Sequence, residues 1–164
     1  MEIEVAQSHE VYAVLELVEE LLMDLVDQGH ELPWIDRDKL HADIRRNLET
    51  ASDARGRTGA MVAILAKERN VAVGMLTLTQ CFSLYAGGEY GVIDEIYVRP
   101  EFRGQDIERQ LLDEAVAIAQ RRGWVRLDVS GPEAERSERA DRFSGTDGQP
   151  LRPVQAVQWR HGGM

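Results

Sequence analysis

Hydrophobic and polar positions change their spacing several times along this chain, and each change marks an expected element. Residues 2–6 alternate between polar and apolar side chains, which predicts a short first strand. The next segment carries apolar residues three and four positions apart until Gly29, which predicts a helix that the glycine ends. A second helical stripe predicts another helix that reaches about Leu48, with Asp36 or Asp38 as its N-cap.

Three β-rich runs follow the helices and predict an antiparallel meander. They span residues 60–68, 71–85 and 90–98 and are joined by short turns that contain Asn or Gly. A polar stretch at 49–59 separates them from the second helix. The first half of the chain therefore predicts two helices followed by an antiparallel sheet.

Helical spacing returns after the meander. Residues 104–123 carry an apolar stripe and end in two arginines and a glycine, which is typical of a helix C-terminus. A β-rich run at 124–130 comes next, and a right-handed crossover would place it parallel to 90–98. A further helix at 132–143 and a last strand at 151–159 complete the order β-α-α-β-β-β-α-β-α-β.

This order predicts an α+β (α/β) fold in a single domain over residues 1–164. The expected architecture is a mixed central sheet of about six strands flanked by about four helices, with a flexible tail at 159–164. The length of 164 residues is sufficient for one full hydrophobic core.

The charge distribution limits the partners. The net charge is −10, and residues 1–58 carry 14 acidic and 6 basic groups whereas residues 99–164 carry 11 of each. An acidic half and a neutral half argue against nucleic-acid binding, and the acidic half either provides solubility or attracts a cationic partner or substrate. The chain shows neither a membrane-spanning apolar run nor a signal-peptide pattern, so a cytoplasmic location is expected. The single Cys81 excludes an internal disulfide, and the scattered histidines predict no metal site.

The most specific pattern in the chain is VIDEIYVRPEFRG at residues 92–104. A strand ends at Val98, a Pro-containing bend follows, and a helix begins shortly after it. Such a junction offers unpaired amides and the positive end of a helix dipole to an anion. Together with the order of elements, this motif resembles the GNAT family of N-acetyltransferases, from about Ile3 to Trp159. The segment ADRFSGTDG at 140–148 is similar to a later helix of that family.

The resemblance implies an acetyl-CoA site in a splay between the strand that ends at Val98 and the parallel strand. The implied cofactor residues are Ile96, Tyr97, Val98, Arg103, Gly104, Gln105, Asp106, Ile107 and Glu108. The strand backbone would hold the pantetheine arm, and the loop amides would hold the pyrophosphate. The acceptor, a small-molecule amine or a peptide, would enter beneath the two acidic N-terminal helices, where a cationic amine fits best. The resemblance also allows a homodimer.

Asp94 and Glu95 are the candidate catalytic carboxylates. Acetyl transfer to an amine needs a base for the ammonium, a donor to the developing oxyanion and a proton for the thiolate. Neighbouring strand residues point to opposite faces, so only one of the two is expected to face the acceptor. Glu95 is favoured because regular alternation places it on one face with the apolar Ile93 and Tyr97. A solvated edge carboxylate without a catalytic role is the alternative.

The chain departs from the family pattern in two places, the pyrophosphate loop and the thiolate end of the site. Where the pyrophosphate loop carries small residues, this chain carries Asp106 and Glu108. Glycine lets the backbone approach phosphates, whereas a carboxylate repels them, although both acids suit the first turn of a helix that binds no ligand. Ser144 stands where the family carries the tyrosine that serves as general acid for the CoA sulfur. The Val98 amide is the candidate donor to the oxyanion.

Two functions are therefore open. The first is an N-acetyltransferase that moves an acetyl group from acetyl-CoA to the amine of a cationic small molecule or peptide. The second is a GNAT-fold protein without acetyltransferase activity, which binds a ligand or partner. A third, weaker hypothesis is an acyl-binding or acyl-transfer protein whose donor lacks the pyrophosphate, such as an acyl carrier protein, but that donor is itself acidic like this chain. Binding of acetyl-CoA distinguishes the first two.

Overall fold

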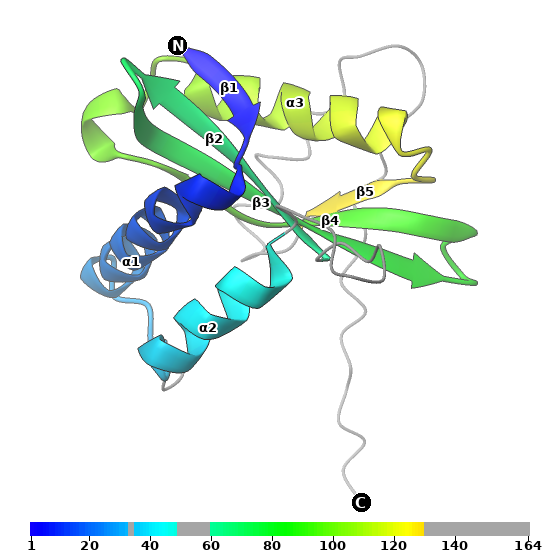
Figure 1. Cartoon of the computed structure of the whole chain (residues 1–164), viewed down its shortest axis with the longest axis horizontal. Helices are drawn as coiled ribbons and strands as arrows, with labels where there is room; N and C mark the ends of the chain where they lie inside the picture. Colours follow the sequence, from blue (N-terminus) through cyan, green and yellow to red (C-terminus); the bar gives the residue numbers. More distant parts are fainter. Residues whose placement is uncertain (33–34, 49–59, 130–164) are drawn as a thin grey trace, which may run out of the picture.

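A five-stranded sheet with helices on both faces forms the part of the chain that the structure describes. The computed structural model describes residues 1–32, 35–48 and 60–129. The strands are β1 (Glu2–Val5), β2 (Met61–Glu68), β3 (Val71–Ser83), β4 (Gly88–Val98) and β5 (Leu127–Val129). The helices are α1 (Val11–Asp27), α2 (Arg37–Asn47) and α3 (Ile107–Arg121), with 3-10 turns η1 (Ser8–Glu10) and η2 (Pro100–Phe102). Helices α1 and α2 cover one face of the sheet and α3 covers the other (Figure 1).

The strand order in the sheet is the order in the chain, β1-β2-β3-β4-β5. The first three pairings are antiparallel, as the short turns predicted, and β5 lies parallel to β4, as the helical crossover predicted. The β4–β5 pairing covers only Gly91, Val92 and Ile93. Beyond Ile93, β4 continues without a β5 partner among the described residues, so its second half presents an open edge.

Each face of the sheet has its own hydrophobic cluster. The cluster beneath α3 includes Leu76, Leu78, Ile93, Ile96, Val98, Ile107 and Leu111. The cluster beneath α1 and α2 includes Val14, Leu17, Ala63, Leu65, Met75 and Tyr97. These two clusters assign the apolar strand residues to a face, and their neighbours in the sheet can be placed from them.

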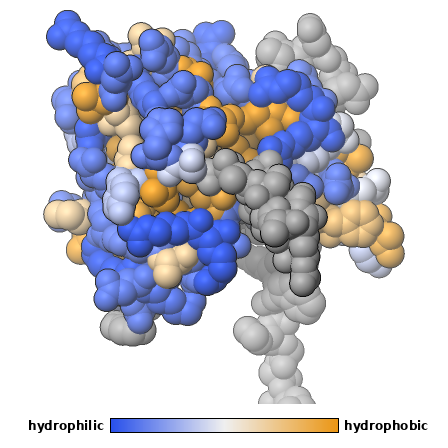
Figure 2. Space-filling model, viewed as in Figure 1, coloured by the Kyte–Doolittle hydropathy of each residue, from blue (hydrophilic) through white to orange (hydrophobic). Residues whose placement is uncertain are grey.

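The surface of α1 and α2 is mostly hydrophilic, whereas apolar side chains gather at the tip of the β3–β4 hairpin (Figure 2). Phe82, Leu84 and Tyr85 are exposed at this tip. Among the described helices, none is both long enough and apolar enough to cross a membrane.

The predicted fold class is confirmed, and the differences lie at the ends of elements. The helix expected from residue 104 begins at Ile107, and the strand expected over 124–130 covers Leu127–Val129. Asp36 is the N-cap of α2, since its side chain accepts a hydrogen bond from the Lys39 amide at 3.0 Å. The expected helix at 132–143, the strand at 151–159, the tail at 159–164 and Ser144 lie outside the described residues.

Candidate functional site

A β-bulge on β4 forms the centre of the candidate site. The register of the β3–β4 ladder shifts by one residue between Leu76 and Leu78, so Thr77 alone opposes both Asp94 and Glu95. Two residues against one is the defining feature of a bulge, which interrupts the ladder and re-aims side chains. The bulge lies where the pairing of β4 with β5 ends.

The bulge shows that the expectation of opposite faces for Asp94 and Glu95 is wrong. Thr77 and Thr79 lie on the α1/α2 face of β3, because they pair with β2 residues that belong to the cluster on that face. The Thr77 hydroxyl donates to Glu95 Oε2, and the Thr79 hydroxyl donates to Asp94 Oδ2 at 2.5 Å. Both carboxylates therefore lie on the α1/α2 face, since the bulge breaks the strict alternation on which the expectation rested.

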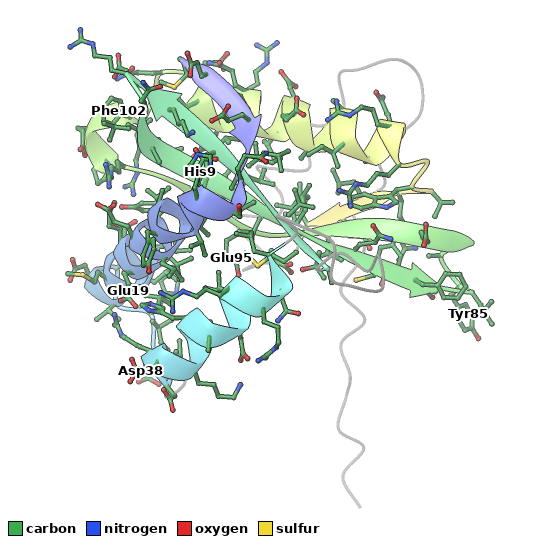
Figure 3. All side chains as sticks on the ribbon, viewed as in Figure 1. His9, Glu19, Asp38, Tyr85, Glu95 and Phe102 are labelled. Carbon is green, nitrogen blue, oxygen red and sulfur yellow. The ribbon has the colours of Figure 1, made fainter. Side chains whose placement is uncertain are left out.

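The neighbours expected for Glu95 are correct in one case and wrong in the other. Tyr97 packs in the cluster beneath α1 and α2, on the same face as Glu95. Ile93 packs beneath α3, on the opposite face, because the extra residue of the bulge intervenes. Glu95 therefore lies on the side of the sheet that faces the two N-terminal helices (Figure 3).

The Glu95 carboxyl has a perturbed acidity. Its pKa is raised, chiefly by desolvation and further by the nearby Asp94 carboxylate, while the hydrogen bond from Thr77 acts in the opposite direction. The side chain nevertheless keeps contact with solvent. Solvent contact moderates the effect of desolvation on this carboxyl. An accessible carboxyl whose pKa is raised is suited to exchange a proton with a bound group.

Asp128 is a third carboxylate close to the bulge, and the sequence reasoning missed it. It pairs with Val92 on β4 and is 6% exposed. Burial raises its pKa, and the ion pair with Arg126 opposes that change. Its only signal in the sequence is one acidic residue inside a β-rich run. Thr77 and Thr79 were also missed, because the register that places them against the two acids is a tertiary property.

The open edge of β4 presents backbone groups of Ile96 and Val98. The Arg99 amide donates to the Val73 carbonyl across the ladder at 2.9 Å. Successive amides of a strand point to opposite edges, so the amides of Ile96 and Val98 point away from β3. Tyr97 directs its backbone groups to β3 instead. The amides of Ile96 and Val98 therefore face the open edge of β4.

The loop from η2 to α3 has the backbone of an anion site. Gly104 and Asp106 adopt left-handed backbone angles, with φ of 77° and 64°. Among the described residues, no protein acceptor is assigned to the amides of Gly104, Gln105, Asp106 and Ile107. This backbone fits the pyrophosphate of acetyl-CoA. The side chains at 106 and 108 oppose it, since Asp106 adds a negative charge at the N-cap of α3 and Glu108 adds one in its first turn.

Arg103 is engaged by the protein itself. Its Nε donates to the Val98 carbonyl at 2.9 Å, and its Nη2 donates to the Asp24 carboxylate on α1 at 2.8 Å. The guanidinium also lies over the Tyr97 ring, 5.8 Å from the centroid. Arg103 therefore holds the loop against α1, and its contribution to the loop is structural in this state.

The acidic face of α1 is partly neutralised by basic partners. Arg99 forms hydrogen-bonded ion pairs with Glu20 at 2.7 Å and with Glu16 at 2.9 Å. Glu19 pairs with His41 at 2.9 Å and also with Arg37. These contacts fix α1 above β4 and join it to α2. They also reduce the negative charge that the helices were expected to offer to an acceptor.

The comparisons with known proteins assign the chain to a family. A sequence model of the acetyltransferase (GNAT) family matches residues 17–143, which is most of the chain. The chain belongs to the GNAT family. A search of curated proteins found no match for this GNAT chain.

Solved structures with the same fold are distant in sequence. A predicted acetyltransferase from Clostridium acetobutylicum, solved with acetyl-CoA, has a TM-score of 0.67 and 20% identity, covering 98% of this chain and 99% of the other. A ribosomal-protein-alanine N-acetyltransferase from Brucella melitensis biovar Abortus 2308 has a TM-score of 0.61 and 20% identity, covering 80% of each chain. An aminoglycoside acetyltransferase from an uncultured soil metagenomic sample, in complex with sisomicin, has a TM-score of 0.63 and 14% identity, covering 96% of each chain. These similarities support the GNAT fold.

No group of three or more potential metal ligands occurs in the part of the chain that the structure describes. The residues gathered at the bulge are the carboxylates Asp94 and Glu95 and the hydroxyls of Thr77 and Thr79.

Proposed function

We propose that this protein is an N-acetyltransferase that moves an acetyl group from acetyl-CoA to the amine of a cationic small molecule or a peptide. The observation that carries the proposal is the bulge, which directs the Glu95 carboxyl to the α1/α2 face just after the pairing of β4 with β5 ends. A candidate base and a strand edge that could bind the thioester arm therefore belong to neighbouring residues of β4. The protein acts as a single domain in the cytoplasm.

Glu95 is the proposed general base. Its raised pKa brings it closer to neutral pH, where a base both accepts a proton readily and remains mostly deprotonated. It would remove a proton from the ammonium group, directly or through one water. Asp94 lies on the same face and adds negative charge that attracts a cationic amine. Asp94 is the second candidate for the base.

The cofactor half of the site consists of backbone. Acetyl-CoA supplies the activated acetyl thioester. Ile96 and Val98 would bind its pantetheine arm, and the amides from Gly104 to Glu108 would bind its pyrophosphate. The Val98 amide would donate to the oxyanion. Ser144 is the candidate proton donor to the thiolate.

The acceptor class follows from the carboxylates on the α1/α2 face. Asp94 and Glu95 both belong to that face, so an amine that carries further positive charge is favoured over a neutral one. Two structures of the same fold are named for acceptors of different size, a ribosomal protein alanine and an aminoglycoside. Both are amines, which is consistent with either acceptor type here.

The second candidate is a ligand- or partner-binding protein without acetyl transfer, and Asp106 and Glu108 in the first turn of α3 favour it. Isothermal titration with acetyl-CoA, followed by a transfer assay with polyamines, aminoglycosides and peptides, distinguishes the two. We expect binding and transfer to at least one cationic amine. Absence of binding at millimolar acetyl-CoA would refute the enzyme proposal.

A further inference from the structure

Thr77 contacts Glu95 at two points. It is 1% exposed in the middle of β3 and opposes the bulge. Its hydroxyl oxygen accepts a hydrogen bond from the Glu95 amide at 3.1 Å, and the same hydroxyl donates its proton to Glu95 Oε2. A hydroxyl has one donor and two acceptor sites, so both bonds form together.

The first bond solves a problem that the bulge creates. A bulge leaves a strand amide without its regular ladder acceptor, and an unpaired amide beside the core is costly. The Thr77 hydroxyl oxygen supplies an acceptor for the Glu95 amide at this bulge. The second bond fixes the carboxylate that belongs to the same residue and leaves Oε1 for another partner.

We propose that Thr77 is the positioning residue for Glu95, holding its backbone in the bulge and aiming its carboxylate at the acceptor amine. This role rests on the proposed acetyl transfer, in which Glu95 is the base. Thr79 and Asp94 form a parallel pair next to it, and only one of the two pairs should govern the reaction.

The hydroxyl also has an effect on acidity that a purely structural threonine would lack. The Thr77 bond lowers the pKa of Glu95 against the larger effect of desolvation. Removal of the hydroxyl should therefore raise the pKa of Glu95 further. The acid limb of the pH–rate profile should then move to higher pH, with the same Km for acetyl-CoA.

The test compares Thr77→Val, which removes the hydroxyl, with Thr77→Ser, which keeps it and removes the methyl group. The pKa of Glu95 is measured by ¹³C NMR titration of its carboxyl carbon, assigned with Glu95→Gln. We expect an upward shift in Thr77→Val and the wild-type value in Thr77→Ser. In the transfer assay, Thr77→Val should lose about tenfold in kcat/Km on the acid side, the size expected for one hydrogen bond to a charged group.

Several results would overturn the proposal. An unchanged Glu95 titration in Thr77→Val would do so, as would a Thr77→Ser variant that behaves like Thr77→Val. A pH profile that responds to Thr79→Val but not to Thr77→Val would assign the base to Asp94. If Thr77→Val does not fold, Thr77→Cys replaces it, and its weaker donor should give a smaller upward shift. The titration needs no turnover, so a protein that transfers no acetyl group refutes the proposed function and still decides the role of Thr77.

Discussion

Asp106 is the position at which the sequence and the backbone conflict most clearly, and its replacement gives the sharpest prediction. It is the N-cap of α3 with a φ of 64°, a left-handed conformation that glycine adopts without strain. Its exposed carboxylate also stands at the end of the helix that would bind the pyrophosphate. Asp106→Gly should therefore change both stability and cofactor affinity, for separate reasons.

Two opposing terms set the change in stability. Relief of the left-handed backbone contributes roughly 1–2 kcal/mol in favour of glycine, with a smaller gain for Asp than for bulkier residues. Loss of a carboxylate at the helix N-terminus costs about 0.3–1 kcal/mol. The ion pair with Arg109, at 3.8 Å between exposed side chains, adds little. We expect Asp106→Gly to be as stable as the wild type or up to about 1 kcal/mol more stable in urea unfolding.

The change in affinity comes from charge. Two like charges about 4 Å apart repel by about 1 kcal/mol in water and by more near a protein surface. Removal of one carboxylate should thus lower the Kd for acetyl-CoA by about fivefold or more. The double change Asp106→Gly with Glu108→Gly should lower it further, as measured by isothermal titration.

Two matched variants separate the effect of the charge on acetyl-CoA affinity from the effect of the backbone conformation on stability. Asp106→Asn keeps the size and the tolerance for left-handed angles but removes the charge, so it should reproduce most of the gain in affinity without the gain in stability. Asp113→Asn removes an exposed carboxylate from the same helix about 10 Å further along, a distance close to the screening length of salt. It should change the Kd little. Equal effects of Asp106→Asn and Asp113→Asn, or no effect of either, would refute the charge argument.

Three further perturbations test the site and its frame. Glu95→Gln should lower acetyl transfer by about 10²–10⁴-fold. The pKa of Glu95 is raised in the folded state, so the stability that this group contributes is full at acidic pH and is lost as the pH rises through the folded pKa. Glu95→Gln removes this charge and should therefore also raise the unfolding free energy at neutral pH. A Glu95→Gln variant with full kcat would remove this residue from the mechanism. Arg99→Ala should destabilise the fold by roughly 1–2 kcal/mol in urea unfolding, because it leaves the α1 carboxylates without their shared partner; an unchanged midpoint would show that α1 is held by packing alone. Gly91→Ala should cost roughly 1–3 kcal/mol, because its Cβ would overlap the Trp124 ring, and normal thermal unfolding would contradict that packing.

Much of the fold could be predicted from local pattern. The alternation in 60–98 predicted the meander, and the helical stripe after 104 predicted the crossover that makes β5 parallel. These features depend on residues near one another in the chain, so the sequence carries them directly. The family motif at 92–104 depends on the same local order and was confirmed by the match over residues 17–143.

The site could be predicted only in part. Asp94 and Glu95 were identified by their residue type and position, but regular alternation assigned them to opposite faces. Thr77 has no feature in the sequence that connects it to Glu95, which is 18 residues away. Arg103 was expected at the pyrophosphate, whereas Asp24 and the Val98 carbonyl hold it in the structure.

The sequence by itself determined the elements of the described residues, their order and the residue types available for the proposed acetyl transfer. The tertiary structure decided which side chains meet. Its decisive feature is a one-residue shift in the β3–β4 register, which depends on how two strands pair and pack on two cores. Because side chains alternate along a strand, such a shift changes the face of each residue that follows it. That shift places both carboxylates on the α1/α2 face and gives the Glu95 amide and carboxylate a single partner in Thr77.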